Sequence, residues 1–125
     1  MPIAQIALKE GKSKAYRTAL CDLLYKALRD ALKVPEDDQF ITITEHEAEN
    51  FRYGNAFDIK RSDDLVYVRI TVFDSRTEEQ KKALYRRLSV LYTEKLGLRP
   101  EDLIILVTDA SKENWSFGHG IAQFA

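Results

Sequence analysis

The feature that most constrains this chain is an internal repetition of strand, helix and strand. The first round comprises an apolar stretch at 2–8, a helical pattern at 12–33 and the alternating segment "QFITITEH" at 39–46. The second comprises "LVYVRITVF" at 65–73, a helical pattern that ends near residue 95, and "LRPEDLIILVTD" at 98–109. Apolar residues spaced three and four apart indicate a helix, and strict alternation indicates a strand. The sequence therefore predicts two βαβ units.

The two units overlay when the numbering is shifted by 65 residues, which places Pro35 on Pro100 and Leu23 on Leu88. We expect an α/β (α+β) fold in which two fused βαβ units share a four-stranded, mainly mixed sheet, with both helices on one face. Residues 1–125 would form a single domain, with halves at about 1–60 and 61–125.

The "LVYVRITVF" strand predicts an oligomer. Its residues Val66, Val68, Ile70 and Val72 point to one face of the sheet. The other face carries Leu65, Tyr67 and Phe73, with no helix left to cover it. Burial against other subunits is the simplest way to cover such a face.

Charge and composition exclude several function classes. Lys and Arg number 19 against 20 Asp and Glu, so the net charge of −1 predicts neither nucleic acid nor an anionic membrane as a partner. No apolar run approaches the ~20 residues of a membrane span. The single cysteine, Cys21, fits a reducing, cytoplasmic setting, and a thiol enzyme built on it is disfavoured because no histidine lies at a telling distance. His46 and His119 show no metal-ligand spacing, so we expect no metal.

Arg76 lies at the predicted start of the second helix. In "SRTE", Ser75 followed three residues later by Glu78 is typical of a capping box, and Gly97 is a suitable C-cap. Arg76 would then lie in the first helical turn, where the helix dipole disfavours a cation. A cation beside free N–H groups does form a good carboxylate site. The alternative is a solvated surface arginine.

Pro2 and the tail "NWSFGHG" are two further candidates. Proline is tolerated at the first residue of a strand, so Pro2 could be structural. If Met1 is removed, however, Pro2 becomes a secondary amine that can exchange protons near neutral pH. Trp115 and Phe117 lie two residues apart and face the same way in an extended chain. They could line an apolar pocket or cover the edge of the core.

Together these residues resemble the tautomerase superfamily, and within it the malonate semialdehyde decarboxylase group. The resemblance covers nearly the whole chain and depends on four segments in order: Pro2, "VPEDD" ending in Asp38, "SRTEEQK" at 75–81 and "NWSFGHGIAQF" at 114–124. It implies two fused βαβ units, a homotrimer and cofactor-free chemistry on a small oxo- or unsaturated carboxylic acid.

The resemblance also implies a role for each site residue. Pro2 would transfer protons, Arg76 would bind a substrate carboxylate, and Asp38 would orient substrate or water or tune the proline. Trp115 and Phe117 would form an apolar wall. A neutral Pro2 would act as a general base in keto–enol tautomerisation, and a protonated one as a general acid in hydration or decarboxylation.

One position departs from the decarboxylase pattern, which has two arginines separated by one residue before the "TEEQ" run. Here the first of them is Asp74, which would repel an acidic substrate. Tautomerase or hydratase activity needs fewer cationic contacts than decarboxylation. The alternative is a catalytically weak or inactive trimeric homologue that acts through protein contacts, and a retained Met1 would favour it.

Overall fold

All six predicted elements are present in the computed structural model, which describes residues 1–125. Their boundaries lie within two residues of the predicted ones, except that the last strand begins five residues later than the predicted segment 98–109, because Pro100–Asp102 forms a 3-10 turn. The elements are β1 (Ile3–Lys9), α1 (Lys14–Leu32), β2 (Ile41–His46), β3 (Val66–Phe73), α2 (Glu78–Leu96) and β4 (Leu103–Ala110).

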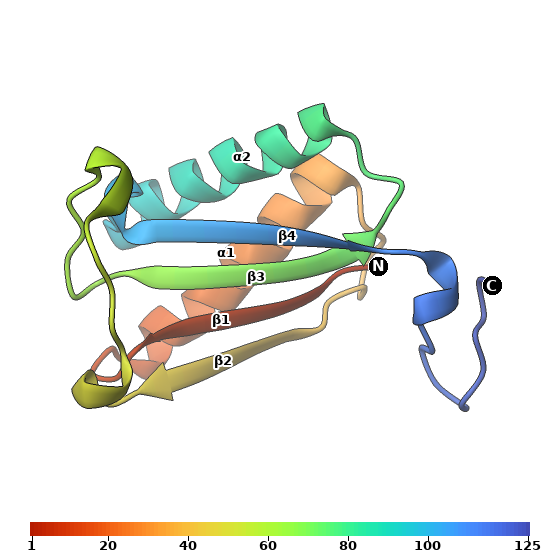
Figure 1. The fold of residues 1–125 in the computed structure, drawn as a ribbon, viewed down its shortest axis with the longest axis horizontal. Coiled ribbons are helices and arrows are strands. Elements are labelled where there is room, and N and C mark those ends of the chain that lie inside the picture. Colours follow the sequence, from red (N-terminus) through yellow and green to blue (C-terminus); the bar gives the residue numbers. More distant parts are fainter.

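The four strands form one mixed sheet in the order β2-β1-β3-β4. Strands β1 and β2 are parallel, β3 and β4 are parallel, and the two central strands, β1 and β3, are antiparallel. Both helices cover the same face of the sheet, and the C-terminal segment projects beyond the end at which the chain begins (Figure 1). The predicted architecture of two βαβ units is confirmed.

The hydrophobic core lies between the sheet and the helices. Alternate residues of the two central strands point into it because side chains alternate between the faces of a strand. Both helices contribute a stripe of leucines at helical spacing. The largest fully buried members are Tyr92, Ile6, Leu20, Leu24, Leu28, Leu32, Ile70, Leu84, Leu88, Val66 and Val68.

The sequence predicts that Leu65 is left uncovered by its own chain, and this prediction is wrong. Leu65 precedes β3, its amide N–H donates to the carbonyl of Ser62, and its side chain is fully buried. Strand alternation applies only within the strand, and Leu65 lies in the turn before β3, outside the main core cluster. Tyr67 and Phe73 do have the parity of the open face.

The internal repeat has a period of 64 residues, not 65. The N-caps Ser13 and Thr77 lie 64 residues apart, and so do the C-caps Lys33 and Gly97. Leu88 therefore corresponds to the fully buried Leu24, whereas Leu23 is only partly buried. The predicted period of 65 residues is wrong because it pairs Pro35 with Pro100, which occupy neighbouring, non-equivalent positions in their loops.

Helix α2 begins two residues later than the capping prediction. Thr77 is the N-cap: its hydroxyl accepts from the amide of Gln80, and the Gln80 side chain accepts from the amide of Thr77. The sequence contains overlapping capping patterns, and the structure uses the second. Arg76 consequently precedes the cap and does not lie in the first helical turn.

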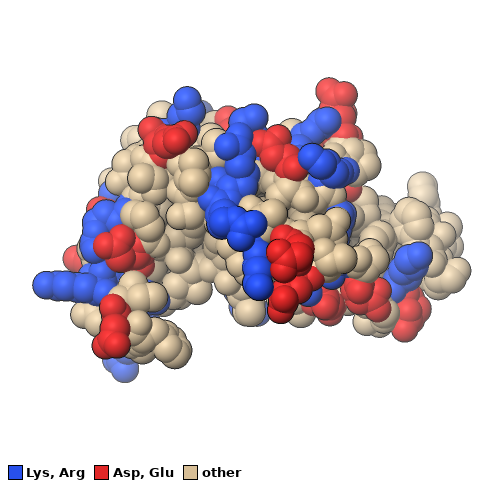
Figure 2. All heavy atoms as spheres, turned by 90° about the horizontal axis from the view of Figure 1, so that it is seen from above, with Lys and Arg blue, Asp and Glu red and all other residues tan.

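Charged side chains of both signs are interspersed on the face that Figure 2 shows, viewed from the α2 side. Neither helix combines the length and the apolar character needed to cross a membrane.

Candidate active site

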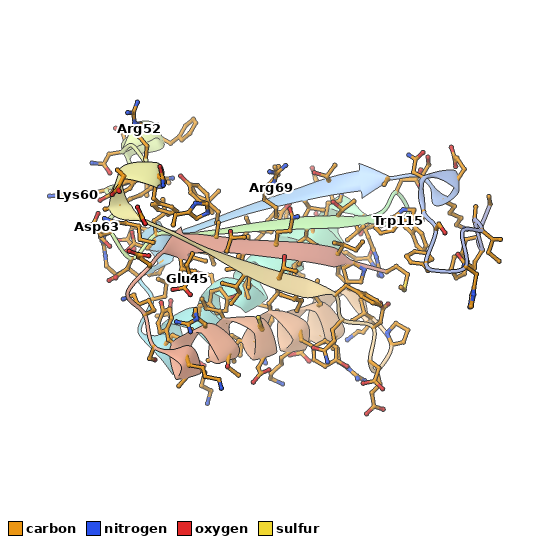
Figure 3. The ribbon with its side chains drawn as sticks, turned by 90° about the horizontal axis from the view of Figure 1, so that it is seen from below. Glu45, Arg52, Lys60, Asp63, Arg69 and Trp115 are labelled. Atoms are coloured by element: carbon orange, nitrogen blue, oxygen red, sulfur yellow. The ribbon has the colours of Figure 1, made fainter.

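The sheet topology gathers the predicted site residues at one end of the molecule. Strands β1 and β2 begin at this end, whereas β3 and β4 end there. Pro2 precedes β1, Asp38 lies in the loop before β2, and Arg76 follows β3. Trp115 belongs to the segment that follows β4 in the chain, and in space it lies near the end of β3 (Figure 3). Ligands tend to bind beyond the carboxyl ends of parallel strands, as β3 and β4 are here.

Asp38 is a buried carboxylate without a hydrogen-bond partner. Its exposed fraction is 6%, and neither side-chain oxygen accepts a hydrogen bond. Its amide donates to the carbonyl of Pro35 at 3.2 Å, in the turn that directs the side chain inward. The amino group of Met1 lies 3.7 Å from Oδ2 and is the only cation that pairs with it. A buried carboxylate with so little compensation is costly, which makes this end of the molecule a candidate functional site.

Arg76 brings a guanidinium to the same place. Its Nη1 donates to the carbonyl of Leu32 at 2.5 Å, across a separation of 44 residues. That carbonyl belongs to the last residue of α1, where the helix dipole favours a cation. The side chain is therefore anchored by one nitrogen, and its remaining donors stay available to a ligand.

The charges of Asp38 and Arg76 both affect the pKa of the Met1 amino group. Burial is the largest influence and lowers the pKa of the Met1 amino group. The charge of Asp38 raises this pKa, while the charge of Arg76 lowers it, and the net shift is downward. A terminal amine held here therefore loses its proton more readily than a free one. Pro2, the next residue, is buried at the entry to β1.

Four aromatic rings form a cluster at this end. The Trp115 and Phe117 rings are stacked with centroids 5.2 Å apart, and Phe73 meets Trp115 edge-on at 5.5 Å. Phe124 contacts both Phe73 and Phe117. The indole nitrogen of Trp115 donates to the carbonyl of Ala110, which fixes the ring against the end of β4.

The sequence reasoning missed Phe73 and Phe124 as members of this cluster. The sequence predicts that Phe73 lies on the open face and needs a cover, and the tail of the same chain supplies that cover through Trp115, Phe117 and Phe124. The signal that could have identified Phe124 is its place in the segment "NWSFGHGIAQF". Asp74 is exposed and takes part in no ion pair.

Cys21 is not placed for nucleophilic chemistry. Burial, and secondarily the charge of Asp22, raises the pKa of its thiol. A raised pKa disfavours the thiolate, which is the reactive form.

Comparison with known families identifies tautomerases over most of the chain. A family model described as a tautomerase enzyme matches residues 38–118, and a second with the same description matches residues 2–57. The probable tautomerase YusQ of Bacillus subtilis (strain 168) is 39% identical over 98% of each chain. The probable tautomerase YrdN of the same organism is 30% identical, over 99% of this chain and 96% of that protein.

Solved structures agree with the sequence comparisons. A crystal structure of malonate semialdehyde decarboxylase superposes with a TM-score of 0.89 at 29% identity, covering 98% of this chain and 95% of that one. FG41 malonate semialdehyde decarboxylase, inhibited by 3-bromopropiolate, gives 0.90 at 26% identity, covering 98% and 93%. Native fused 4-OT has the same fold, with a TM-score of 0.83 at 23% identity over 97% and 96%.

Proposed function

The chain belongs to the tautomerase family, and from this premise we propose that it is a cofactor-free enzyme acting on a small oxo- or unsaturated carboxylic acid. Its general acid/base is the amine of Pro2, exposed once Met1 is removed. The observation that carries the proposal is the position of the Met1 amino group, which lies beside the buried carboxylate of Asp38, an acceptor of no hydrogen bond, and within the field of Arg76.

Keto–enol tautomerisation is the reaction that this arrangement supports best. The substrate carboxylate binds the free donors of Arg76, which place the enol beside the amine. The neutral amine takes the proton of the enol hydroxyl, and the resulting ammonium returns a proton to the neighbouring carbon. Product and substrate contain the same atoms, and the amine returns to its starting state. Burial lowers the pKa of the Met1 amino group at this position. A lowered pKa would suit the amine of Pro2 as well, because the amine would be neutral over more of the working range.

Trp115 and Phe117 line the apolar side of the proposed site. Aromatic walls exclude water and lower the local dielectric, so the attraction between Arg76 and a developing negative charge is stronger than in water. Asp38 opposes the effect of burial on the pKa of the terminal amine, because its charge favours the protonated form. The balance between burial and Asp38 therefore decides whether Pro2 is a base or an acid.

Hydration and decarboxylation are the neighbouring possibilities. A malonate semialdehyde decarboxylase related by 29% identity was crystallised as wild type, as a mutant with its first residue changed from proline to alanine, and in an inactivated form, in a study of its decarboxylase and hydratase activities. Asp74 stands where the decarboxylase pattern has an arginine, and we rank decarboxylation below tautomerisation for this reason.

Assembly into a homotrimer belongs to the same proposal. At the amino-terminal end of the molecule, Ile3 is exposed on the open face of the sheet, and Phe40 is exposed just before β2. Fused 4-OT, a structural neighbour, is an asymmetric trimer in one solved structure and a symmetric trimer in another. Contact between subunits would remove this apolar surface from water.

The second candidate is a catalytically weak or inactive trimer that acts through protein contacts. Asp74 favours it, because a carboxylate two residues from Arg76 weakens an anion site. A retained Met1 would favour it too, since the nitrogen of Pro2 would then be an amide.

The deciding experiment combines intact mass of the untagged protein with an enol-to-keto assay on phenylpyruvate. We expect loss of the methionine and measurable turnover. Pro2→Ala should lower kcat/KM by ~100-fold or more, the usual range for loss of a general acid/base. The matched control Pro100→Ala, at the other end of the molecule, should retain full activity. A processed wild type without turnover on this or related 3-oxo and unsaturated acids would establish the inactive trimer instead.

A further inference from the structure

The repeat of 64 residues extends beyond the βαβ units into the segments that follow β2 and β4. The segment "ENFRYG" at 49–54 corresponds to "ENWSFG" at 113–118, and each begins in a short 3-10 turn. Phe51 is thus the counterpart of Trp115, and Tyr53 that of Phe117. Even an ion pair is repeated: Arg17 with Glu45 in the first unit, and Lys81 with Asp109 in the second.

The end of the molecule opposite the amino terminus is therefore a second copy of the candidate active site. Its buried carboxylate is Asp102, the counterpart of Asp38, with an exposed fraction of 0%. Unlike Asp38, it is fully partnered: Ser62 donates to it through its amide and hydroxyl at 2.7 and 2.6 Å, and Arg99 contacts it at 3.5 Å. The counterpart of Pro2 is Val66, whose nitrogen is an amide within the chain. This end has no amine and cannot perform the proposed chemistry.

A cavity is nevertheless present at this second end. It has a volume of about 500 Å³ and opens onto the face of the sheet away from the helices. Phe51 and Tyr67 form one wall, with ring centroids 5.4 Å apart, and His46 lies 5.9 Å from Phe51. The Tyr67 hydroxyl donates to the carbonyl of Arg52, which ties the loop to β3. A cavity of this size and lining is typical of a small-molecule site.

The charged side chains that line the cavity favour binding of an anion. No Asp or Glu lines it, whereas Arg69 and Arg52 do. Arg69 stands on the open face near the centre of the sheet, and Arg52 lies on the loop at the end opposite Trp115 (Figure 3). The neighbour of Arg69 across the antiparallel pair is Gln5, and Arg69 takes part in no ion pair. An arginine beside apolar and aromatic surface is suited to bind a carboxylate.

We propose that this cavity is a second, non-catalytic site that binds a small carboxylic acid with an aromatic group. The carboxylate pairs with Arg69, and the ring packs against Phe51 and Tyr67. The site keeps the type of wall found at the amino-terminal end and lacks the amine, so it binds without turnover. It does not depend on the proposed function, because none of its residues belongs to the Pro2 site.

The test uses 4-fluorobenzoate, which cannot tautomerise, and follows binding by fluorine NMR. Arg76→Gln removes the carboxylate contact at the first end, so binding that survives in this variant reports the second. In that background, Arg69→Gln should weaken binding by about tenfold or more, the usual effect of losing a hydrogen bond to a charged group. Arg86→Gln, an exposed arginine on α2, is the matched control and should leave binding unchanged. Leu106→Trp, which fills the cavity and keeps Arg69, should also weaken binding.

Three results would overturn the proposal. The first is absence of binding in Arg76→Gln, and the second is equal binding with and without Arg69. The third is a change in assembly mass in Arg69→Gln without an effect on the probe, which would mean that another subunit fills the cavity. The single variant Arg69→Gln should retain the turnover of wild type. If wild type has no turnover, the proposed function fails while the binding measurement still decides the second site.

Discussion

At the scale of single residues, the two buried carboxylates differ in how their charge is compensated. Asp38 has no hydrogen-bond partner, and its nearest cation is the amino terminus at 3.7 Å. Asp102 receives hydrogen bonds from Ser62 and Arg99. The two residues occupy equivalent positions in the repeat, so the difference between them comes from the side chains that surround each carboxylate and not from the path of the backbone.

This contrast predicts opposite effects of the same substitution. Asp38→Asn removes an uncompensated buried charge, so the free energy of unfolding should stay level or rise by ~1 kcal/mol. Asp102→Asn breaks a satisfied network and should lower it by about 2 kcal/mol or more. Urea unfolding at neutral pH measures both. Equal losses in the two variants would show that Asp38 is a structural residue like its counterpart.

The residues of the site were only partly predictable from the sequence. The family resemblance, more than any local pattern, predicts the site residues Pro2, Arg76, Asp38, Trp115 and Phe117, and the structure brings them to one end of the sheet. The anchoring of Arg76 by the carbonyl of Leu32 joins residues 44 positions apart, and no local pattern carries that information. Their proposed roles still depend on the activity measurements.

At the scale of the elements, local periodicity is sufficient to predict both α-helices and all four strands, but not the 3-10 turn Pro100–Asp102 inside the segment predicted as the last strand. It is insufficient for details in which two patterns compete. Ser75 and Thr77 both open a capping pattern, and only the path of the chain after β3 selects Thr77. The prolines Pro35 and Pro100 suggested a period that differs by one residue from the true one, because loops tolerate such a shift and helices do not.

The contact between the two helices should make the protein sensitive to alkali. The hydroxyl of Tyr92 on α2 donates to the carbonyl of Leu20 on α1 at 2.8 Å, and burial strongly raises its pKa. An unfolded tyrosine loses its proton near pH ~10, whereas the folded one keeps it. Stability from this group is thus complete below pH ~10 and is lost as the pH rises further.

Tyr92→Phe should lower the free energy of unfolding at pH 7 by ~1–2 kcal/mol, because the Leu20 carbonyl loses its side-chain donor. The decline above pH ~10 should also be shallower than in wild type. Urea unfolding at several pH values measures both effects, with Tyr85→Phe, half-buried on the same helix, as the control. An unchanged alkaline decline in Tyr92→Phe would place its origin elsewhere.

At the scale of the whole molecule, one face of the sheet is covered by helices and the other is open. The proposed trimer would use the open face at the amino-terminal end of the molecule, where Ile3 is 45% exposed. Val90 has the same exposed fraction on α2 and provides a matched comparison.

Ile3→Glu should therefore reduce the mass of the assembly in light scattering, because a charge at a subunit contact is desolvated without a partner. Val90→Glu should leave the mass unchanged. The opposite pattern would place the subunit contact on the helical side. Circular dichroism of both variants checks that the monomer remains folded.

The antiparallel pairing of β1 and β3 at the centre of the sheet limits the stoichiometry of the proposed chemistry. Each chain presents two equivalent ends, but a polypeptide has only one amino terminus, and the peptide bond before Val66 consumes the nitrogen at the second end. Each chain therefore supplies one terminal amine for the two ends that the repeat relates, and this ratio holds for an assembly of any size. Titration with a reagent specific for the terminal amine should saturate at one equivalent per chain, and the end at Val66 should not react with it.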